Sequence, residues 1–271
     1  MRTQSALLAL LCACAFASPA QAADESSPLD LVQRAYDRTL RAPGVRSLEL
    51  AIYRGGRLVS RRAFDVAYRP ESGASQSLLR FTAPSYLRGD ALLLVETPSG
   101  ASDVWLYQSE ERRPRRVGAA HRADAFYGSD LSYEELEHQR FAAWSLRLLP
   151  SDDPAAALVE AIPPADSQYG RLRIWIDRAR TAIARIDFFR GAESQPAKRL
   201  SVSLDGVVEE AGYLRVERMR IEQVGRDAWT DVATARMEID PAISPALFSA
   251  ALLERESDDL YALAARAGAV P

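Results

Sequence analysis

The sequence predicts a mainly β protein built on a single antiparallel sheet. Over most of the chain apolar and polar residues alternate with a period of two, which is typical of strands with one buried and one solvated face. Helical patterns are few and short, and the 271 residues, 48% apolar and 26% charged, have an ordinary globular composition. Because no linker and no internal repeat interrupts the pattern, we expect one domain over residues 23–271.

The first element is a well-marked helix at 28–42. Ser27 is placed to cap its first turn, Pro28 suits the first helical position, and Pro43 with Gly44 ends it. The apolar residues on one face of this helix are Leu29, Val32, Tyr36 and Leu40. Such an amphipathic helix is expected to lie over an apolar surface of the sheet.

Strands follow from residue 48 onwards, where the period changes from about 3.6 to two. Gly55 and Gly56 predict the first hairpin turn. In chain order, strands are expected at 48–52, 64–68, 79–81, 91–95, 103–107, 144–148, 158–162, 172–176, 184–188, 200–204 and 229–239. Three more short helical segments are expected at 132–139, 245–252 and 258–267.

A sheet of about ten or eleven strands must cover its apolar face, and these short helices cannot cover all of it. The sheet is therefore expected either to curl on itself or to leave an apolar hollow partly roofed by helices. Curled sheets commonly enclose ligand cavities, so the pattern favours a barrel-like or half-barrel container over a sandwich. Alternation alone does not tell which face is concave. The candidate cavity residues, all on apolar strand faces, are Leu50, Phe64, Phe81, Leu94, Trp105, Tyr107, Ile174, Ile186, Phe188 and Met237.

Cysteine and histidine are scarce, which excludes several kinds of site. The chain holds only Cys12, Cys14, His121 and His138. Both cysteines lie in the first 22 residues, so the rest of the chain has no thiol for disulfides, for zinc or iron–sulfur ligation, or for nucleophilic catalysis. We therefore expect no metal and no cofactor.

Residues 1–22 have the pattern of a cleaved signal peptide. Arg2 gives the positive start, 5–17 form the apolar core, and 20–22 give a small-x-small cleavage pattern, so the mature chain is expected to begin at Ala23. An apolar core of about 13 residues is too short to span a bilayer, which needs roughly 20. A lipid anchor at Cys14 is the less favoured alternative, because the apolar run before it is very short. We expect an exported, periplasmic monomer.

Among the basic residues arginine predominates, with Lys198 as the single lysine. Arginines that alternate with acids along strands indicate a solvated sheet face. The net negative charge is unlike that of a nucleic-acid-binding surface, so no nucleic-acid partner is expected. One run concentrates positive charge: Arg112, Arg113, Arg115 and Arg116. We interpret it as a charged hairpin turn, with docking to an acidic partner or to anionic lipid headgroups as the alternative.

The segment 126–136 is the most distinctive local feature. Gly128 permits a tight backbone, Asp130 can accept amide hydrogen bonds, and Ser132 with Glu135 forms the S-x-x-E pattern of a capping box. The residues of this motif are Gly128, Ser129, Asp130, Ser132, Tyr133 and Glu135. The carboxyl groups could act as acids or bases, but the structural explanation accounts for each of them. No catalytic residue is therefore assigned.

Several of these segments, in their order and spacing, resemble the LolA-like, outer-membrane lipoprotein-sorting family in its broader periplasmic branch. The matching segments are 81–84 with 88–90, 103–107, 126–136, 173–177 and 248–255. The resemblance implies a strongly curved antiparallel half-barrel whose apolar concave face is covered by short helices. It also implies a periplasmic carrier that holds acyl chains of lipids or lipoproteins, in outer-membrane lipoprotein sorting or hydrophobe transport. An RND-type exporter or an outer-membrane receptor is the partner that it suggests.

Two other functions stay open. The first is a non-catalytic adaptor of an RND-type exporter, whose interior would be filled rather than hollow. The second is a periplasmic hydrolase. The sequence has no G-x-S-x-G elbow, and a catalytic triad would depend on His121 or His138.

Overall fold

A computed structural model describes residues 27–72, 74–97, 102–118, 121–240, 242–255 and 259–267. The predicted signal peptide, both cysteines and the predicted mature N-terminus lie outside these residues, so they stay predictions. Among the described residues, no helix is both long enough and apolar enough to cross a membrane.

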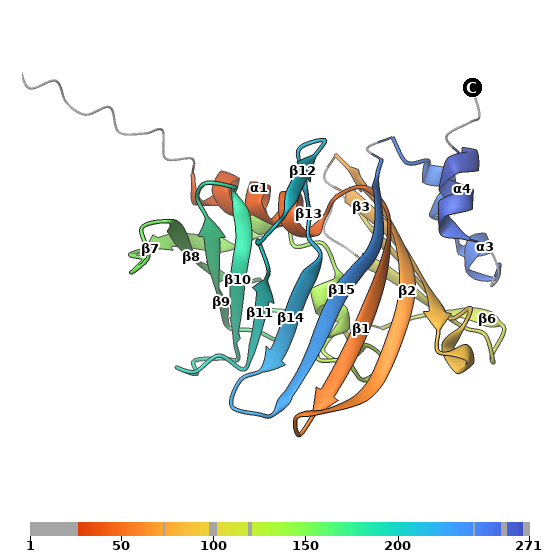
Figure 1. Ribbon diagram of the computed structural model, residues 1–271, viewed down its shortest axis with the longest axis horizontal. Coiled ribbons are helices and arrows are strands. Elements are labelled where there is room, and N and C mark those ends of the chain that lie inside the picture. The colour runs from red at the N-terminus through yellow and green to blue at the C-terminus, as the bar shows by residue number, and fades with distance from the viewer. Residues whose placement is uncertain are drawn as a thin grey trace, which may run out of the picture.

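Strands dominate the described chain, with a few short helices at its start, middle and end (Figure 1). The strands are β1 Gly44–Arg54, β2 Arg57–Glu71, β3 Ala74–Ala83, β4 Ala91–Glu96, β5 Ser102–Gln108, β6 Arg113–Arg116, β7 Ser145–Leu149, β8 Ala156–Ile162, β9 Arg171–Asp177, β10 Ala182–Phe189, β11 Lys198–Val202, β12 Val208–Glu210, β13 Tyr213–Arg215, β14 Arg218–Gln223 and β15 Ala228–Ile239. The α-helices are α1 Pro28–Leu40, α2 Tyr133–Leu136, α3 Ala250–Leu253 and α4 Leu260–Ala267, and the single-turn 3₁₀ helices are η1 Ser85–Leu87, η3 Phe126–Gly128, η4 Phe141–Ala143 and η5 Pro245–Leu247.

One antiparallel sheet of 13 strands forms the body of the described protein, in the order β6-β5-β4-β3-β2-β1-β15-β14-β11-β10-β9-β8-β7. Most neighbours in the sheet are also neighbours in sequence. The exceptions are β1 beside β15, which joins the two halves, and β11 beside β14, which leaves β12 and β13 as a separate hairpin. The predicted fold class, a single curved antiparallel sheet with short helices, is confirmed.

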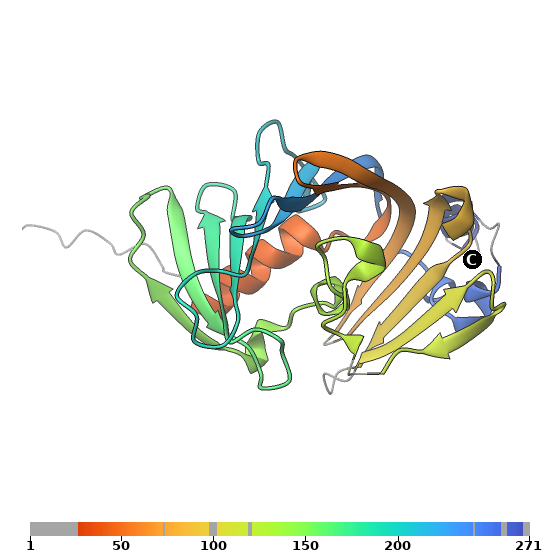
Figure 2. The same ribbon diagram turned by 90° about the horizontal axis from the view of Figure 1, so that it is seen from below.

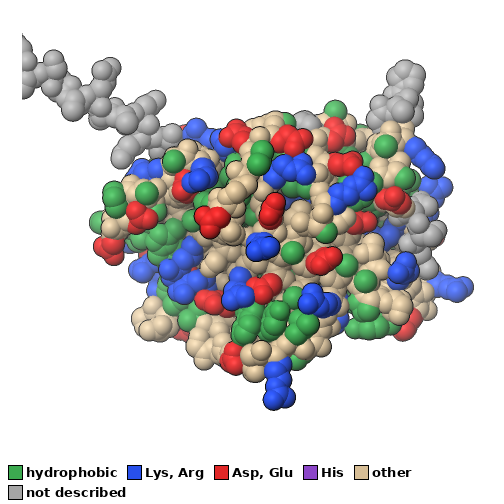
Figure 3. All heavy atoms as spheres, viewed as in Figure 1, with side chains coloured by type: hydrophobic (Ala, Val, Ile, Leu, Met, Phe, Trp, Pro, Cys, Tyr) green, Lys and Arg blue, Asp and Glu red, His purple; other side chains and the backbone are tan. Residues whose placement is uncertain are grey.

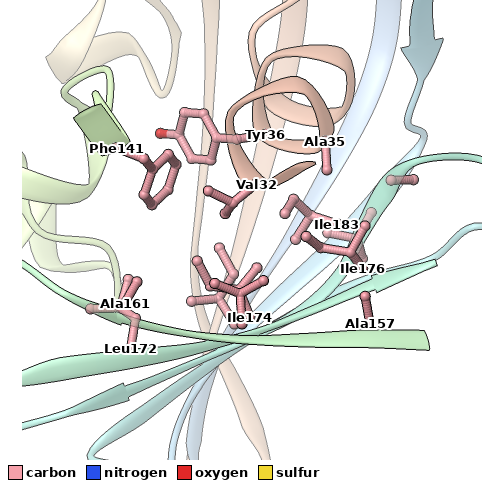
Figure 4. Close-up of a cluster of buried hydrophobic side chains, with 14 of the residues drawn as sticks. Val32, Ala35, Tyr36, Phe141, Ala157, Ala161, Leu172, Ile174, Ile176 and Ile183 are labelled. Carbon is pink, nitrogen blue, oxygen red and sulfur yellow. The ribbon is translucent and has the colours of Figure 1, made fainter. Parts of the chain in front are cut away.

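The sheet curls around α1, which lies inside this curl between the β7–β10 end and the β2–β5 end (Figure 2). As predicted, the Ser27 hydroxyl caps α1 by accepting from the backbone N–H of Asp30, and Pro28 follows in the first turn. Val32 on the inner face of α1 points toward Ile174 on β9, and the ring of Tyr36 lies beside that of Phe141 (Figure 4). The burial of this helix face against β8–β10 forms the core of one half of the protein.

The other half of the concave face is packed with aromatic rings. Phe64 and Phe81 lie opposite each other on β2 and β3 with ring centroids 5.4 Å apart. Phe126, from the segment before α2, packs on both rings at 5.9 and 5.8 Å. The segment that carries η3 and α2 is therefore held against this half of the sheet by aromatic contacts.

The C-terminal helices cover the opposite, convex face of β1–β5. Leu252 and Tyr261 pack there against Leu78 and Leu93, whereas the next residue on β4, Leu94, faces the concave side. The continuous apolar run in β4 follows from burial on both faces. The expectation that short helices cover the concave face holds for α1 and α2 but is wrong for α3 and α4.

The rest of the convex face carries interspersed arginines and acids (Figure 3). Arg220 on β14 pairs with Asp231 on β15 at 2.6 Å, and Arg199 on β11 pairs with Asp187 on β10 at 2.8 Å. These cross-strand pairs explain why arginine and acid alternate in the sequence. This half of the face is solvated, as predicted from the pattern.

Candidate functional site

Two adjoining apolar cavities lie between the concave face of the sheet and the elements that cover it. Their volumes are about 140 Å³ and 70 Å³. The residues that line both cavities are Tyr36, Leu40, Leu131, Glu135 and Leu200. The two cavities are therefore compartments of one hollow, floored by β-strands and roofed by α1 and the segment that ends in α2.

Four of the ten predicted cavity residues line this hollow. Phe64 and Leu94 line the larger cavity, and Ile186 and Phe188 line the smaller one. Three more line neither cavity but belong to the two buried clusters that contain these four: Leu50, Phe81 and Ile174. Whether any of them binds a ligand stays a prediction.

The other three predicted residues are not in the hollow. Trp105 and Tyr107 on β5 belong to the cluster beneath the C-terminal helices, on the opposite face of the sheet, so placing them in the cavity was wrong. The physical reason is that β5 is apolar on both faces, and alternation does not identify the concave one. Met237, near the end of β15, is buried but lines neither cavity.

Sequence reasoning missed several cavity residues. Met219 and Val232 line the larger cavity from β14 and β15, and Leu200 lies in the wall between the two cavities. A signal did exist for Tyr36 and Leu40, because both lie on the apolar face predicted for the first helix. For the residues on β11, β14 and β15, only the strand order could have shown that they meet at one cavity.

A buried ion pair holds Glu135, which lines both cavities. Lys198 Nζ lies 3.1 Å from Glu135 Oε1 and 3.4 Å from Oε2, with side chains only 6% and 7% exposed. The Tyr169 hydroxyl also donates to Glu135. Burial, together with the charge of Glu135, raises the pKa of Tyr169, so this hydroxyl stays protonated as the donor. The single lysine of the chain, which itself lines neither cavity, thus holds a cavity-lining carboxylate in place.

Glu135 is also part of the predicted capping box, which is present. The Ser132 backbone N–H donates to Glu135 Oε2 at 2.7 Å, and the Ser132 hydroxyl accepts from the Glu135 backbone N–H. One carboxylate therefore serves both the start of α2 and the lysine of β11. Tyr133, the next residue, packs edge-on to Phe126 at 5.7 Å.

Asp130 anchors the distinctive segment to the sheet. Its carboxylate accepts from Arg54 at 2.9 Å and from the Thr230 hydroxyl at 2.7 Å, while its backbone N–H donates to Thr230 Oγ1 at 3.0 Å. The Asp130 side chain is only 2% exposed. It therefore ties the segment to β1 and β15, whereas the sequence predicted only amide hydrogen bonds within the loop.

The backbone before Asp130 needs a left-handed conformation. Gly128 has φ of +76°, with open space where a side chain would start, so its need for glycine is conformational rather than steric. Ser129, which is buried, closes the turn by donating to the Phe126 carbonyl at 2.7 Å.

The arginine-rich run forms the turn before β6 and β6 itself, at one edge of the sheet. All four arginines are exposed. Arg115 lies near Glu111 at 3.9 Å and Arg116 pairs with Asp103, whereas Arg112 and Arg113 form no ion pair with any residue that the structure describes. A docking role for this turn stays a prediction.

Neither histidine has the surroundings of a catalytic triad. His121 is exposed and pairs with Asp124 at 2.8 Å. His138 Nε2 lies 2.8 Å from Asp37, and its Nδ1 is buried without a hydrogen-bond partner. Within the described ranges, no serine hydroxyl is hydrogen-bonded to either ring. Nothing in this geometry favours the hydrolase alternative.

A strongly curved antiparallel sheet over an apolar hollow, with a helix inside the curl, defines a protein of the LolA-like fold. A domain assigned to outer membrane lipoprotein sorting from Vibrio parahaemolyticus matches with a TM-score of 0.74 and 21% identity, over 84% of this chain and 98% of that one. A DUF1329 family protein from Desulfovibrio piger matches with a TM-score of 0.73 and 20% identity, over 83% and 97%. A LolA superfamily protein from Nitrosomonas europaea matches with a TM-score of 0.64 and 12% identity, over 81% and 96%.

At these identities the similarity shows the fold, and the resemblance predicted from the sequence is confirmed. A family model described as an uncharacterized protein matches residues 73–255, and the chain belongs to that family. Comparison with curated proteins gave no match.

Proposed function

We propose that this protein is a periplasmic carrier that binds acyl chains of lipids or lipoproteins in the hollow of its sheet. The observation that carries the proposal is the pair of adjoining apolar cavities, whose walls are mostly aliphatic and aromatic. The LolA-like fold, shared with a domain assigned to lipoprotein sorting, supports it. A protein with a filled interior, as the adaptor alternative requires, would have no such hollow.

Binding would be driven by burial of methylene groups, each of which contributes about 0.8 kcal/mol. Typical ligand pockets have volumes of roughly 300–1,000 Å³, and both cavities are smaller than this. A long acyl chain therefore requires the roof to move outward. The roof consists of α1 and the segment that ends in α2, and it rests on the sheet largely through side-chain contacts.

Release would require an acceptor with a better apolar site, because the sequence contains no P-loop through which nucleotide hydrolysis could drive the step. An RND-type exporter or an outer-membrane receptor would fill this role. The exposed arginine turn at β6 is our candidate for contact with an acidic surface of that acceptor.

The proposal is tested by native mass spectrometry of protein purified from the periplasm, followed by lipid extraction and by titration with a fluorescent fatty acid. A plug variant, Leu200→Trp, places an indole between the two cavities. The matched control, Ile162→Trp, adds the same ring at a side chain that is 47% exposed. Circular dichroism shows whether each variant is folded.

We expect co-purified lipid and saturable uptake for the wild type and the control, and at least a tenfold weaker uptake for the plug variant. Absence of bound lipid together with no uptake by the wild type would refute the carrier function. Equal uptake by the plug variant would show that binding takes place elsewhere.

A further inference from the structure

Two arginines border the larger cavity, which is otherwise mostly apolar. Arg41 follows α1, and Arg46 lies near the start of β1. Neither forms an ion pair with any residue in the described part of the chain. Most arginines on the convex face, by contrast, pair with acids on neighbouring strands.

Neutral groups accept the hydrogen bonds of the Arg41 guanidinium group. Its Nη2 donates to the Tyr36 hydroxyl and to the Leu136 carbonyl, both at 3.0 Å, and also to the Glu137 carbonyl. The guanidinium group also lies 5.6 Å and 5.7 Å from the ring centroids of Tyr36 and Tyr68. Arg41 thus links α1, the end of α2 and the sheet.

Arg46 is much less well satisfied. Its Nη2 donates to the Leu40 carbonyl at 3.1 Å, and its Nε is buried without any hydrogen-bond partner. Burial, followed by the like charge of Arg41, lowers the pKa of Arg46 to about 10. The group still carries its full charge at neutral pH.

The acids near the cavity do not pair with Arg46. Glu135 lines the cavity but is neutralised by Lys198. Glu96 accepts from the Ser75 hydroxyl and from the His138 backbone N–H. The charge of Glu96 also attracts Arg41, so the positive charge without an acidic partner at the hollow is that of Arg46. A buried charge in an apolar surrounding is unfavourable unless an anion neutralises it.

We infer that the hollow binds a single-chain amphiphile with an anionic head, a carboxylate or a phosphate, whose head accepts a hydrogen bond from Arg46. The inference rests on the proposed function and specifies its ligand. An anionic head would accept from the free Nε–H and neutralise the arginine, and charge-assisted hydrogen bonds are the strong ones. The chain would then lie along the apolar wall formed by Phe64, Leu94 and Val232.

The test compares three probes with the same chain: dodecanoate, dodecyl phosphate and dodecanol. Each is titrated into the purified wild type, into Arg46→Met, and into Arg61→Met as the control, because Arg61 is exposed on β2. Methionine keeps an unbranched apolar stem like that of the arginine while it removes the guanidinium charge. Thermal unfolding of the ligand-free proteins checks that both variants fold.

For the wild type and the control we expect at least one anionic probe to bind about tenfold or more tightly than dodecanol. In Arg46→Met this preference should fall below about threefold, with dodecanol binding retained. A preference for the carboxylate or for the phosphate identifies the head. Equal binding of all three probes to the wild type, or an unchanged preference in Arg46→Met, would overturn the inference while leaving the carrier function intact.

If no probe binds to the wild type, the carrier function and the inference both fail. If Arg46→Met does not fold, Arg46→Lys, which keeps a charge but cannot reproduce the guanidinium geometry, replaces it. That variant should lose part of the preference for an anion, and no loss would count against the inference.

Discussion

The buried pair of Lys198 and Glu135 gives the sharpest stability prediction. Replacing Lys198 with Met leaves the Glu135 carboxylate buried beside the cavity, with side-chain exposure of only 7% and one remaining side-chain donor, Tyr169. Removal of one partner of such a pair typically costs about 3–5 kcal/mol. The reverse change, Glu135→Gln, strands the lysine and also weakens the cap of α2, so it should cost at least as much.

The double variant should recover much of this loss, because no uncompensated charge remains. We expect each single variant to lower the free energy of unfolding by about 3 kcal/mol or more, and the coupling energy of the pair to be about 2 kcal/mol. Urea unfolding measures this: with a slope of about 2–3 kcal/mol/M, the midpoint should fall by roughly 1–1.5 M in each single variant.

The control is Glu238→Gln, which removes an acid from an ion pair whose side chains are 56% and 54% exposed. Its effect should stay below about 1 kcal/mol, since exposed pairs contribute little. The reasoning is wrong if Lys198→Met is no more destabilising than this control, or if the losses of the two single variants simply add in the double variant.

Other predictions follow from the same contacts. Leu94→Ala and Leu93→Ala should each destabilise by about 2–5 kcal/mol, but only Leu94→Ala should alter fatty-acid uptake, because Leu93 faces the C-terminal helices. Burial opposes ionisation of Asp187, but hydrogen bonds from arginines outweigh it and hold its pKa below the usual range. The stability it contributes is therefore present above about pH 4 and lost as the pH falls further, so Asp187→Asn should flatten acid unfolding curves in that window. Asp130→Ala should cost about 2 kcal/mol in urea unfolding, because it leaves the buried Thr230 hydroxyl without its acceptor, whereas the 38% exposed side chain of Arg54 contributes little; a loss below about 1 kcal/mol would contradict the anchoring role.

Local patterns predicted most of the fold. The first helix, the capping box at α2 and eleven strands of the sheet could be read from periodicity and capping residues. Two strands of the sheet were missed. β6 has the sequence RPRR, and β14 alternates arginine with Met219 and Ile221, so neither shows the strongly apolar face by which the other strands were recognised.

The site was less accessible to sequence reasoning because it depends on contacts between distant residues. Lys198 and Glu135 are 63 positions apart, and nothing in either local pattern predicts that they meet. The face of β5 was assigned wrongly for a similar reason: its second apolar face is covered by helices that come about 140 residues later. The strand order and the position of the covering helices decide which side chains meet and which sheet face is concave. The alternation of apolar and polar residues contains information on neither.

The single lysine has a further consequence for how the hollow can be observed. Reagents that modify amines should reach Lys198 only slowly, because its side chain is 6% exposed and its amine is held by Glu135 of α2. Its rate of acylation would therefore report how often the roof opens, read at one position without any engineered label. A bound amphiphile that holds the roof closed would slow that rate, and one that props it open would increase it.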